Sequence, residues 1–553
     1  MNAPERAVPE RESLTVEFKS DRSRLSDRDL VAAVVCLANT EGGDIYLGVE
    51  RDGRITGVHP EHQNLTSMAA MIANRTSPSV SVRVTAIAVA GTVVARVEVP
   101  KSPRLTATSE GTLLRRRLQA DGTPQCMPLY PHEFITRQSD IGLLDYSALP
   151  AEGATTADLD PLERQRLRQM VELYHGDHAL ATLADDELDS ALGFVRSDGE
   201  RRVPTVTGLL LIGHEVAIRR HLPTHEVAFQ VLDGTQVRVN EFYRGPLIRV
   251  FETIMGQFSS RLKEEEVQVG LFRVPIPEFD RRAFREAIVN ALVHRDYTRQ
   301  GAVHVRWQTD GMVISNPGGF VEGVSLANLL VVEPRPRNPL LADTIKRVGL
   351  AERTGRGVDL IYEGLLRYGR PAPDYSGSDP TTVVVRLSSA DADLPFARLV
   401  LEEEKRVGRR LPLDALIILS RLRSERRLGI HEAAAAIQRN EAATRAVLER
   451  LVEAGLVEGI GATRGRSYTL SARVYRIFGE KAGYVRQVGF DRIQQEQMVL
   501  KYALAHGRVA RNEVVSLCGL GPHQATRLLR SLAHQGKLIK RGERRGAFYE
   551  PAP

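Results

Sequence analysis

Three polar side chains recur at four-residue intervals in the segment FREAIVNALVHRDY, residues 284–297: Glu286, Asn290 and His294. At 3.6 residues per turn they share one arc of a helix. The opposite arc holds Phe284, Ile288, Ala291 and Leu292. A carboxylate four residues before an amide suits nucleotide hydrolysis, because Glu286 can orient and deprotonate a water while Asn290 offers its oxygen to Mg²⁺. The alternative is a surface helix with a solvated polar face, since this spacing is common by chance.

Glycines further along the chain favour a ligand site. A strand-like VHVRWQ precedes DGMVISNPGGF (310–320) and then LAERTGRGVDLIYEG (350–364). Gly318 and Gly319 allow the backbone to approach a ligand closely. Gly355 and Gly357 precede an apolar helix whose first N–H groups can hold phosphate. Three such elements in this order are rarer by chance than one.

These residues resemble the ATP-binding domain shared by DNA gyrase, MutL and sensor histidine kinases, often named GHKL. Glu286 and Asn290 match its conserved helix, and the two glycine pairs match its glycine boxes; the resemblance implies ATP and Mg²⁺ as ligands, with His294 and Asn316 beside them. Where those ATPases carry Asp in D-x-G-x-G, this chain reads Asn316-Pro-Gly-Gly. It is more similar to a divergent branch with N-P-G, found in bacterial regulators often labelled helicase-like. Because no G-x-x-x-x-G-K-[ST] loop occurs, we expect no duplex unwinding.

A second signature comprises ESLTVEFKSD (12–21) and LVAAVVCLANTEGGDIYLGVERDGRITGV (30–58). The pattern predicts a strand, an apolar helix, a turn at two glycines and another strand. It resembles the Schlafen or AlbA-type nucleic-acid-binding domain over roughly the first 135 residues.

In nuclease-active Schlafens, two glutamates five residues apart and a later acidic residue hold a metal ion. Glu12 and Glu17 have this spacing, and Glu50 or Asp52 would be the third carboxylate. Three carboxylates can hold a divalent ion that polarises a phosphodiester. Alternatively, Glu17 pairs with Lys19 and the domain only binds nucleic acid, which is the interpretation we favour.

Composition indicates a soluble globular protein of three to five domains: 553 residues, 42% hydrophobic and 26% charged. Without a long apolar run or signal peptide, we expect a cytoplasmic protein with no membrane contact. Cys36, Cys126 and Cys518 are scattered and odd in number, so we expect neither a disulfide framework nor a zinc site.

Positive charge gathers at the C-terminal end. Residues 401–553 hold 28 Lys and Arg against 16 Asp and Glu, or +12, which leaves −6 for the remainder of the +6 total. This end contains two similar units, each predicted as helix, helix, turn, helix and a hairpin. Both resemble a winged helix-turn-helix, in which the third helix enters the DNA major groove and the wing contacts backbone or minor groove.

The resemblance to a winged helix-turn-helix indicates candidate DNA-binding residues in both units. On the third helices they are Thr444, Arg445, His523, Gln524, Arg527 and Arg530, and on the wings Arg464, Arg466, Lys540, Arg541, Arg544 and Arg545. The first unit has an alternative role in packing or dimerisation, because its third helix carries Glu441, Glu449 and Glu453. The second, with 9 basic and 3 acidic residues between 508 and 550, is the better DNA candidate.

The expected fold is multidomain α+β: a Schlafen/AlbA-like α+β domain, a GHKL-like α/β sandwich and tandem winged helices. The boundaries we expect are 1–138 for the first domain, 139–275 for a linking scaffold, 276–390 for the ATP-binding domain, 391–412 for a charged connector, 413–472 for the first winged helix, 473–490 for a connector and 491–553 for the second winged helix. In the scaffold, His214 and His225 are expected to pack or face solvent rather than bind metal.

From these features we expect an ATP-binding, DNA-binding regulator that acts as a homodimer on double-stranded DNA and hydrolyses ATP slowly with Mg²⁺. The rival hypothesis is a Schlafen-type metal-dependent nuclease gated by ATP, with a role in phage defence.

Overall fold

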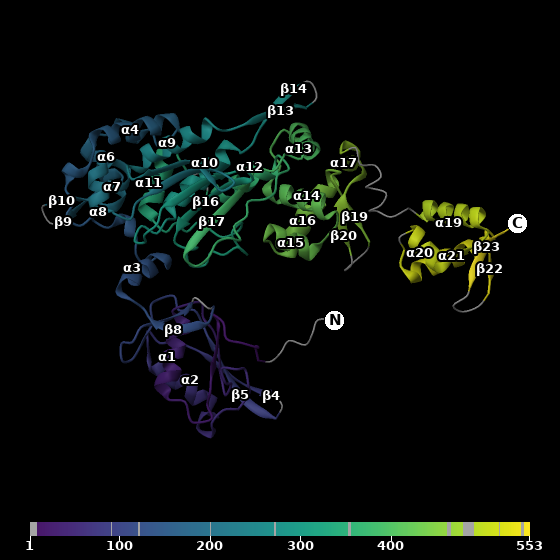
Figure 1. Cartoon of the computed structure of the whole chain (residues 1–553), viewed down its shortest axis with the longest axis horizontal. Coiled ribbons are helices and arrows are strands. Elements are labelled where there is room, and N and C mark those ends of the chain that lie inside the picture. The colour runs from purple at the N-terminus through teal and green to yellow at the C-terminus, as the bar shows by residue number, and fades with distance from the viewer. Residues whose placement is uncertain are drawn as a thin grey trace.

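The computed structural model describes residues 8–89, 91–119, 122–198, 201–269, 272–351, 355–461, 466–478, 492–518, 520–542 and 547–552. In Figure 1 the N-terminal unit lies below the middle unit, with one helix, α3 (Pro131–Asp140), between them. Among the described residues, no helix is both long and apolar enough to cross a membrane.

The N-terminal unit is a four-stranded sheet in the order β1-β2-β5-β4, with its apolar core formed against two helices. β1 and β2 run parallel, and the other neighbours are antiparallel. Gly43 has a φ of 134°, and a Cβ there would overlap the Thr15 carbonyl, which explains the T-E-G-G turn. Its elements are β1 (Val16–Lys19), α1 (Asp27–Ala38), β2 (Gly43–Leu47), α2 (Leu65–Asn74), β3 (Thr76–Ser77), β4 (Arg83–Val89), β5 (Thr92–Val99), β6 (Ala107–Thr108), β7 (Leu114–Leu118) and β8 (Pro124–Pro128).

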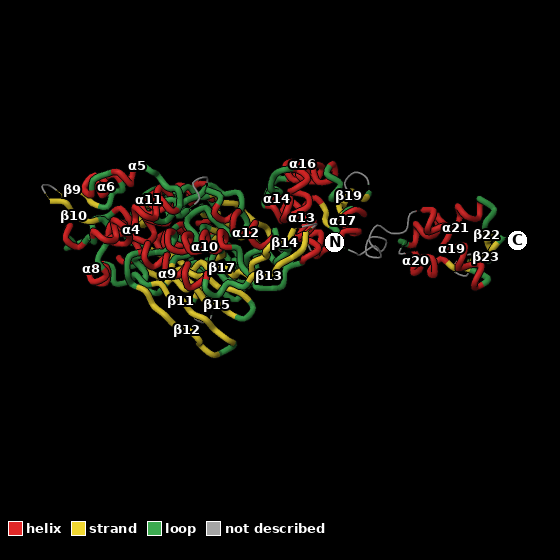
Figure 2. Tube along the Cα trace, turned by 90° about the horizontal axis from the view of Figure 1, so that it is seen from above, coloured by secondary structure: helices red, strands yellow, loops and turns green. Residues whose placement is uncertain are grey.

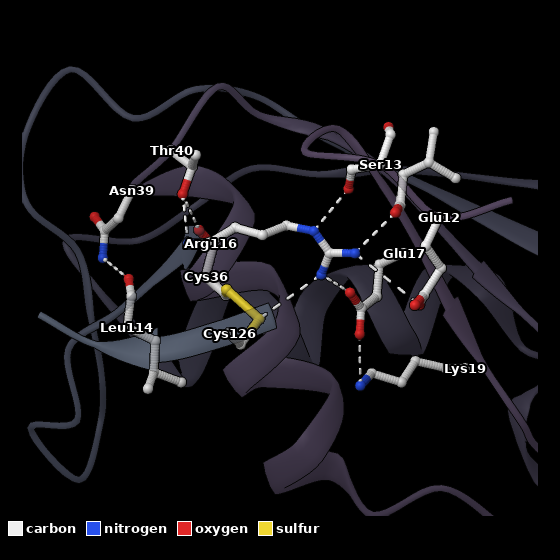
Figure 3. The surroundings of a disulfide bond; sticks show 11 residues. Glu12, Ser13, Glu17, Lys19, Cys36, Asn39, Thr40, Leu114, Arg116 and Cys126 are labelled. Atoms are coloured by element: carbon white, nitrogen blue, oxygen red, sulfur yellow. Dashed lines mark hydrogen bonds and ion pairs between the residues drawn. A yellow bond between two sulfur atoms is a disulfide. The ribbon is translucent and has the colours of Figure 1, made fainter. Parts of the chain in front are cut away.

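A disulfide joins Cys36 of α1 to Cys126 of β8, with their Cα atoms 5.9 Å apart (Figure 3). The expectation of no disulfide was therefore wrong. The two cysteines are 90 residues apart in the sequence and become neighbours only when the β7–β8 hairpin packs beside α1. Cys518 is a buried free thiol.

The middle unit contains a five-stranded mixed sheet in the order β12-β11-β15-β16-β17. Its N-terminal half comprises α4 (Pro161–Leu173), α5 (Ala179–Thr182), α6 (Asp185–Ala191), β9 (Val195–Asp198), β10 (Arg201–Pro204), α7 (Val206–Ile212), α8 (Glu215–His221), β11 (Val227–Asp233), β12 (Gln236–Tyr243) and α9 (Leu247–Ser259). The other half comprises β13 (Glu264–Val269), β14 (Phe272–Pro277), α10 (Arg281–Val293), β15 (Val303–Gln308), β16 (Gly311–Pro317), α11 (Pro339–Val348), α12 (Gly357–Leu366) and β17 (Thr382–Ser388).

Helices cover one face of this sheet, as Figure 2 shows for α9, α10 and α12 beside β11, β12 and β15. Along β15, Val303, Val305 and Trp307 are buried in alternation with less buried residues, as expected for a sheet with one covered face. Because β11 pairs in parallel with β15, the sheet takes two strands from region 139–275. The expected boundary at 275 therefore does not separate two cores, since one apolar core runs from Ala151 to Leu387.

The two C-terminal units share the order helix, short strand, two helices and two strands, and the first unit has one further helix before and one after it. The first has α13 (Leu394–Val407), α14 (Leu413–Glu425), β18 (Leu428–Gly429), α15 (Ile430–Ile437), α16 (Glu441–Glu453), β19 (Val457–Ile460), β20 (Ser467–Leu470) and α17 (Ala472–Ile477). The second has α19 (Arg492–His506), β21 (Val509–Ala510), α20 (Arg511–Cys518), α21 (Pro522–His534), β22 (Leu538–Arg541) and β23 (Phe548–Pro551). Each contains a three-stranded sheet, ordered β18-β20-β19 and β21-β23-β22.

The charged connector expected at 391–412 is instead a packed helix over most of its length. Phe396, Leu399 and Val400 of α13 are buried in the core of the first C-terminal unit. Their i, i+3, i+4 spacing is that of an amphipathic helix, which the surrounding charges obscured in the sequence.

Candidate functional site

The predicted helix at 284–297 is α10, which begins at Arg281 and ends at Val293, with His294 as its C-cap. Asp280 caps its N-terminus by accepting hydrogen bonds from the backbone N–H groups of Arg282 and Ala283, each at 2.9 Å. Phe284 of the apolar arc stacks on Phe258 of α9, while the arc that carries Glu286 and Asn290 lies beside the start of α12. Glu286 is only 1% exposed, so α10 holds this carboxylate away from bulk solvent.

A cavity of about 270 Å³, here named the central pocket, lies between α10, α12 and the sheet. Its lining includes almost all the predicted nucleotide-site residues: Glu286, Asn290, His294, Asn316, Gly319, Gly355 and Gly357. Ile314, Val383 and Val385 add an apolar surface from β16 and β17. An apolar cavity with a few convergent polar groups is the usual form of a small-molecule site.

The glycines allow the backbone to approach this polar group. A Cβ at Gly357 would lie 3.1 Å from Oε2 of Glu286 and 3.4 Å from Nδ2 of Asn290. The first turn of α12 therefore lies directly beside the carboxylate and the amide. Gly318 does not line the pocket; it turns the chain with a φ of 98° and donates its N–H to the Thr381 carbonyl at 2.7 Å.

Four charged residues of the central pocket were not predicted: Glu333, Arg335, Lys346 and Asp359. Burial raises the pKa of the Asp359 carboxyl, against the lowering effect of Arg356. The two cations are suited to phosphate oxygens. They lie on α11 and the loop before it, where no glycine motif or regular spacing marks them in the sequence.

His294 is neutral at neutral pH, because desolvation, reinforced by the positive charges of Arg337 and Lys346, lowers its pKa to about 4. Its carbonyl accepts a hydrogen bond from Nε of Arg337 at 3.1 Å. Arg337 also donates to the Gly319 carbonyl at 2.8 Å, so one buried guanidinium ties the end of α10 to the first glycine box. His294 can therefore offer a hydrogen bond to a ligand but no positive charge.

Acidification from pH 7 to 5 is expected to destabilise the middle unit by about 2 kcal/mol for each of His225 and His294. Both have a pKa of about 4 when folded, below the ordinary value of 6.5, chiefly because of burial. Between these values the unfolded chain binds more protons, so this stability is present above pH 6.5 and is lost as the pH falls towards 4. The free energy of unfolding at each pH is measured by urea unfolding, followed by the fluorescence of the single tryptophan, Trp307.

The control variants for this measurement are His294→Gln and His534→Gln. His294→Gln should lose less stability on acidification than the wild type. The same substitution at the exposed His534 should leave the pH dependence unchanged. Equal pH slopes for wild type and His294→Gln would contradict the assigned pKa.

In the N-terminal unit, the candidate metal carboxylates surround an arginine (Figure 3). Arg116 of β7, with its side chain 1% exposed, pairs closely with Glu17 and lies 4.0 Å from Oε1 of Glu12. Glu17 also pairs with Lys19 at 2.7 Å, as the alternative interpretation predicted. Arg116 was missed, and the run of three arginines at 115–117 was its only signal.

The third carboxylate does not join this group. Glu50 accepts hydrogen bonds from the hydroxyls of Thr56 and Ser20, each at 2.8 Å, and these bonds lower its pKa. Asp52 caps a turn by accepting from the Arg54 N–H at 3.0 Å. Within the described residues, no cluster of three His, Cys, Asp or Glu side chains is arranged to hold a metal.

The DNA candidates on the second C-terminal unit are exposed: His523, Gln524, Arg527 and Arg530 on α21, and Lys540 and Arg541 on β22. In the first unit Arg445 and Arg466 are exposed. Thr444 is fully buried and its hydroxyl donates to the Asn440 carbonyl at 2.9 Å, so its predicted role in DNA recognition is wrong. Arg464, Arg544 and Arg545 lie outside the described residues.

Three family models match parts of the chain. Residues 12–121 match "Schlafen, AlbA_2", residues 134–228 match a domain of unknown function (DUF8451), and residues 300–387 match "Putative ATP-dependent DNA helicase recG C-terminal". The chain thus contains a Schlafen/AlbA_2 domain and an ATPase-like domain, as the two resemblances predicted, and these suggest a nucleic-acid-binding protein associated with ATP. The third match includes both glycine pairs and Asn316 but begins after Glu286 and Asn290.

Among solved structures, the crystal structure of the DIP2311 protein from Corynebacterium diphtheriae is similar. It is 24% identical, with a TM-score of 0.50, and the match covers 84% of this chain and 94% of that chain. This likeness concerns the fold alone. No curated protein matches the chain.

Proposed function

We propose that this protein is an ATP-binding, DNA-binding regulator in which the nucleotide state of the central pocket modulates DNA binding. One observation carries the nucleotide half of the proposal: Glu286, Asn290 and Gly357, which are 71 residues apart from first to last, meet at one wall of the central pocket. A general base, a Mg²⁺ ligand and a phosphate-holding helix start are the parts that nucleotide hydrolysis needs.

The residues present fit Mg-ATP. Asn290 would hold Mg²⁺ through its amide oxygen, and Arg335 and Lys346 would meet phosphate oxygens. The bound metal would neutralise charge on the phosphates. Glu286 would orient and deprotonate the attacking water, because it is the carboxylate beside both Asn290 and the first turn of α12. A GHKL-like sandwich is supported by helices on one face of a mixed sheet.

Double-stranded DNA is the proposed partner of the C-terminal units. Three helices followed by a hairpin, with a short strand after the first helix, is the element order of a winged helix-turn-helix, and it occurs twice. In the second unit the exposed arc of α21 is basic, which suits the major groove. We also propose a homodimer as the acting form.

The test is DNA affinity with and without nucleotide. Fluorescence anisotropy on a labelled mixed-sequence duplex, with Mg-ATP and with Mg²⁺ alone, should give dissociation constants that differ about 5- to 150-fold, the usual range of coupling between two sites. Equal constants, under conditions where calorimetry shows ATP bound, would refute a regulatory role for the nucleotide.

The rival nuclease hypothesis is tested on the same protein. We expect no cleavage of RNA or single-stranded DNA with Mg²⁺ or Mn²⁺, because the guanidinium of Arg116 occupies the space between Glu12 and Glu17 that a metal would need. Cleavage that Glu17→Gln abolishes, and that Glu110→Gln at an exposed site retains, would reverse this conclusion.

A further inference from the structure

The segment that joins β16 to α11, residues 318–337, forms a large part of the central pocket and is named here the bridging segment. It supplies 12 of the 32 residues that line this cavity. One of them, Leu330, also packs against the apolar core of the first C-terminal unit. A ligand in the central pocket would therefore touch a segment that reaches a proposed DNA-binding unit.

Gln438, in the turn between α15 and α16, hydrogen-bonds this unit to the bridging segment. Its Oε1 accepts a hydrogen bond from the Leu330 N–H at 2.8 Å, and its Nε2 donates to the Leu326 carbonyl at 2.8 Å. The amide thus binds the backbone of the bridging segment at two points. Gln438 lies three residues before Glu441, where the proposed recognition helix of this unit begins.

Gln438 also has an unusual backbone. Its φ is 55° and its ψ 35°, the left-handed region that a residue with a side chain seldom adopts. Such a conformation persists only where the surroundings impose it, and it occurs often at functional positions. Gln438 is the C-cap of α15, and its own N–H donates to the Ala434 and Ala435 carbonyls, while its side chain holds the bridging segment. The turn before α16 and the bridging segment therefore meet at this one residue.

The two ends of the bridging segment are anchored elsewhere. Glu322 pairs with Lys101 at 2.9 Å and with Arg137 at 3.1 Å, and its N–H donates to the Asp140 carbonyl at 3.1 Å. At the other end, Arg337 is bonded to the carbonyls of His294 and Gly319. The part between these anchors, residues 324–336, is the part that lines most of the pocket wall and meets Gln438.

We infer that Gln438 is the positioning residue through which the central pocket acts on the first C-terminal unit. This rests on the proposed function, because it names the route by which nucleotide would modulate DNA binding. Mg-ATP bound against residues 324–336 shifts the position of the bridging segment. This shift changes the geometry of the two hydrogen bonds to Gln438 and, through them, the conformation of the turn before α16. The change of conformation comes from ligand contacts that differ between two arrangements of this segment.

The experiment compares wild type with Gln438→Ala as full-length proteins. Two quantities are measured: ATP binding by calorimetry, and the ratio of DNA dissociation constants without and with Mg-ATP by anisotropy. Gln438→Ala should bind ATP as the wild type does, while the ratio falls to about 1. Hydrogen exchange adds a structural readout: in the wild type ATP should change the exchange of peptides covering 326–332 and 434–442, and in the variant only that of the first.

Two further variants make the result specific. Gln535→Ala, which changes an exposed glutamine at the C-cap of α21, should keep the wild-type ratio. Gln438→Gly removes the same two hydrogen bonds but accommodates a positive φ. Its ratio of DNA dissociation constants without and with Mg-ATP should also fall to about 1, and it replaces Gln438→Ala if that variant folds poorly. Thermal unfolding and circular dichroism check the fold of each.

The outcomes separate this inference from the proposed function. If the wild type responds to ATP and Gln438→Ala or Gln438→Gly responds equally, the route through Gln438 is overturned while the proposed function stands. If the wild type binds ATP but its DNA affinity does not respond, the proposed function is overturned and the route with it. Loss of the ratio in both Gln438 variants, but not in Gln535→Ala, supports the inference.

Discussion

Asn290→Ala is expected to weaken Mg²⁺-dependent ATP binding by about 100-fold or more, because loss of even an indirect metal contact costs about 10- to 100-fold in affinity. The amide lies on the wall of the central pocket, next to the first residue of α12. A smaller side chain leaves a water in place of its oxygen, without a fixed ligand for Mg²⁺. Calorimetry with Mg-ATP, and with ATP in EDTA, measures the loss.

The matched control is Asn240→Ala, which removes the same amide from an exposed position on β12. It should bind Mg-ATP like the wild type. If Asn290→Ala also does so, Asn290 is not the metal ligand and the similarity to GHKL proteins does not extend to the magnesium site.

Glu286→Gln is expected to separate binding from hydrolysis. The amide keeps the size of this buried side chain but cannot accept a proton, so turnover should fall by about 100- to 10,000-fold, the usual contribution of a general base. ATP affinity should change little. A phosphate-release assay beside calorimetry measures both quantities. Full turnover in Glu286→Gln would assign the base to another group, and Glu333 and Asp359 are the other carboxylates that line the central pocket.

Local spacing was sufficient to predict the central pocket. The four-residue interval of Glu286, Asn290 and His294 needs only the helix period, and glycine boxes mark backbone turns by residue type. The helix period could also have excluded Thr444 from the candidate DNA-binding residues. It shares a helical face with Val447, Leu448 and Leu451, all buried, so its position relative to these apolar residues should have placed it in the core.

Long-range pairs could not be predicted in this way. Arg116 meets Glu17 across about 100 residues of sequence, Cys36 meets Cys126 across 90, and Leu330 meets Gln438 across 108. Such contacts depend on how strands and hairpins dock, and they leave no periodic pattern. The pairing of β11 with β15 is a further example, because a parallel neighbour is set by the crossover between the strands rather than by either strand.

The second C-terminal unit is expected to supply most of the DNA affinity, through Arg527 and Arg530. Ala525, Leu528, Leu529 and Leu532 of α21 are buried, and the two arginines lie exposed on the other arc. The hairpin adds Arg541, whose exposed guanidinium is bonded to Glu550 at 3.0 Å. An arginine that contacts a base edge contributes about 1–3 kcal/mol, and one that contacts phosphate adds about one unit to the salt slope.

The double variant Arg527→Ala/Arg530→Ala should therefore bind a mixed-sequence duplex about 10-fold or more weakly, with a salt slope lower by about 2 if both arginines contact phosphate. Anisotropy across a range of salt concentrations measures both quantities. Arg219→Ala/Arg220→Ala removes the same charge from an exposed part of α8 and should leave both unchanged. If instead the two double variants weaken binding equally, DNA affinity follows total charge, and α21 is not a recognition helix. A loss of affinity with an unchanged salt slope would place Arg527 and Arg530 against base edges, because counterion release reports only phosphate contacts.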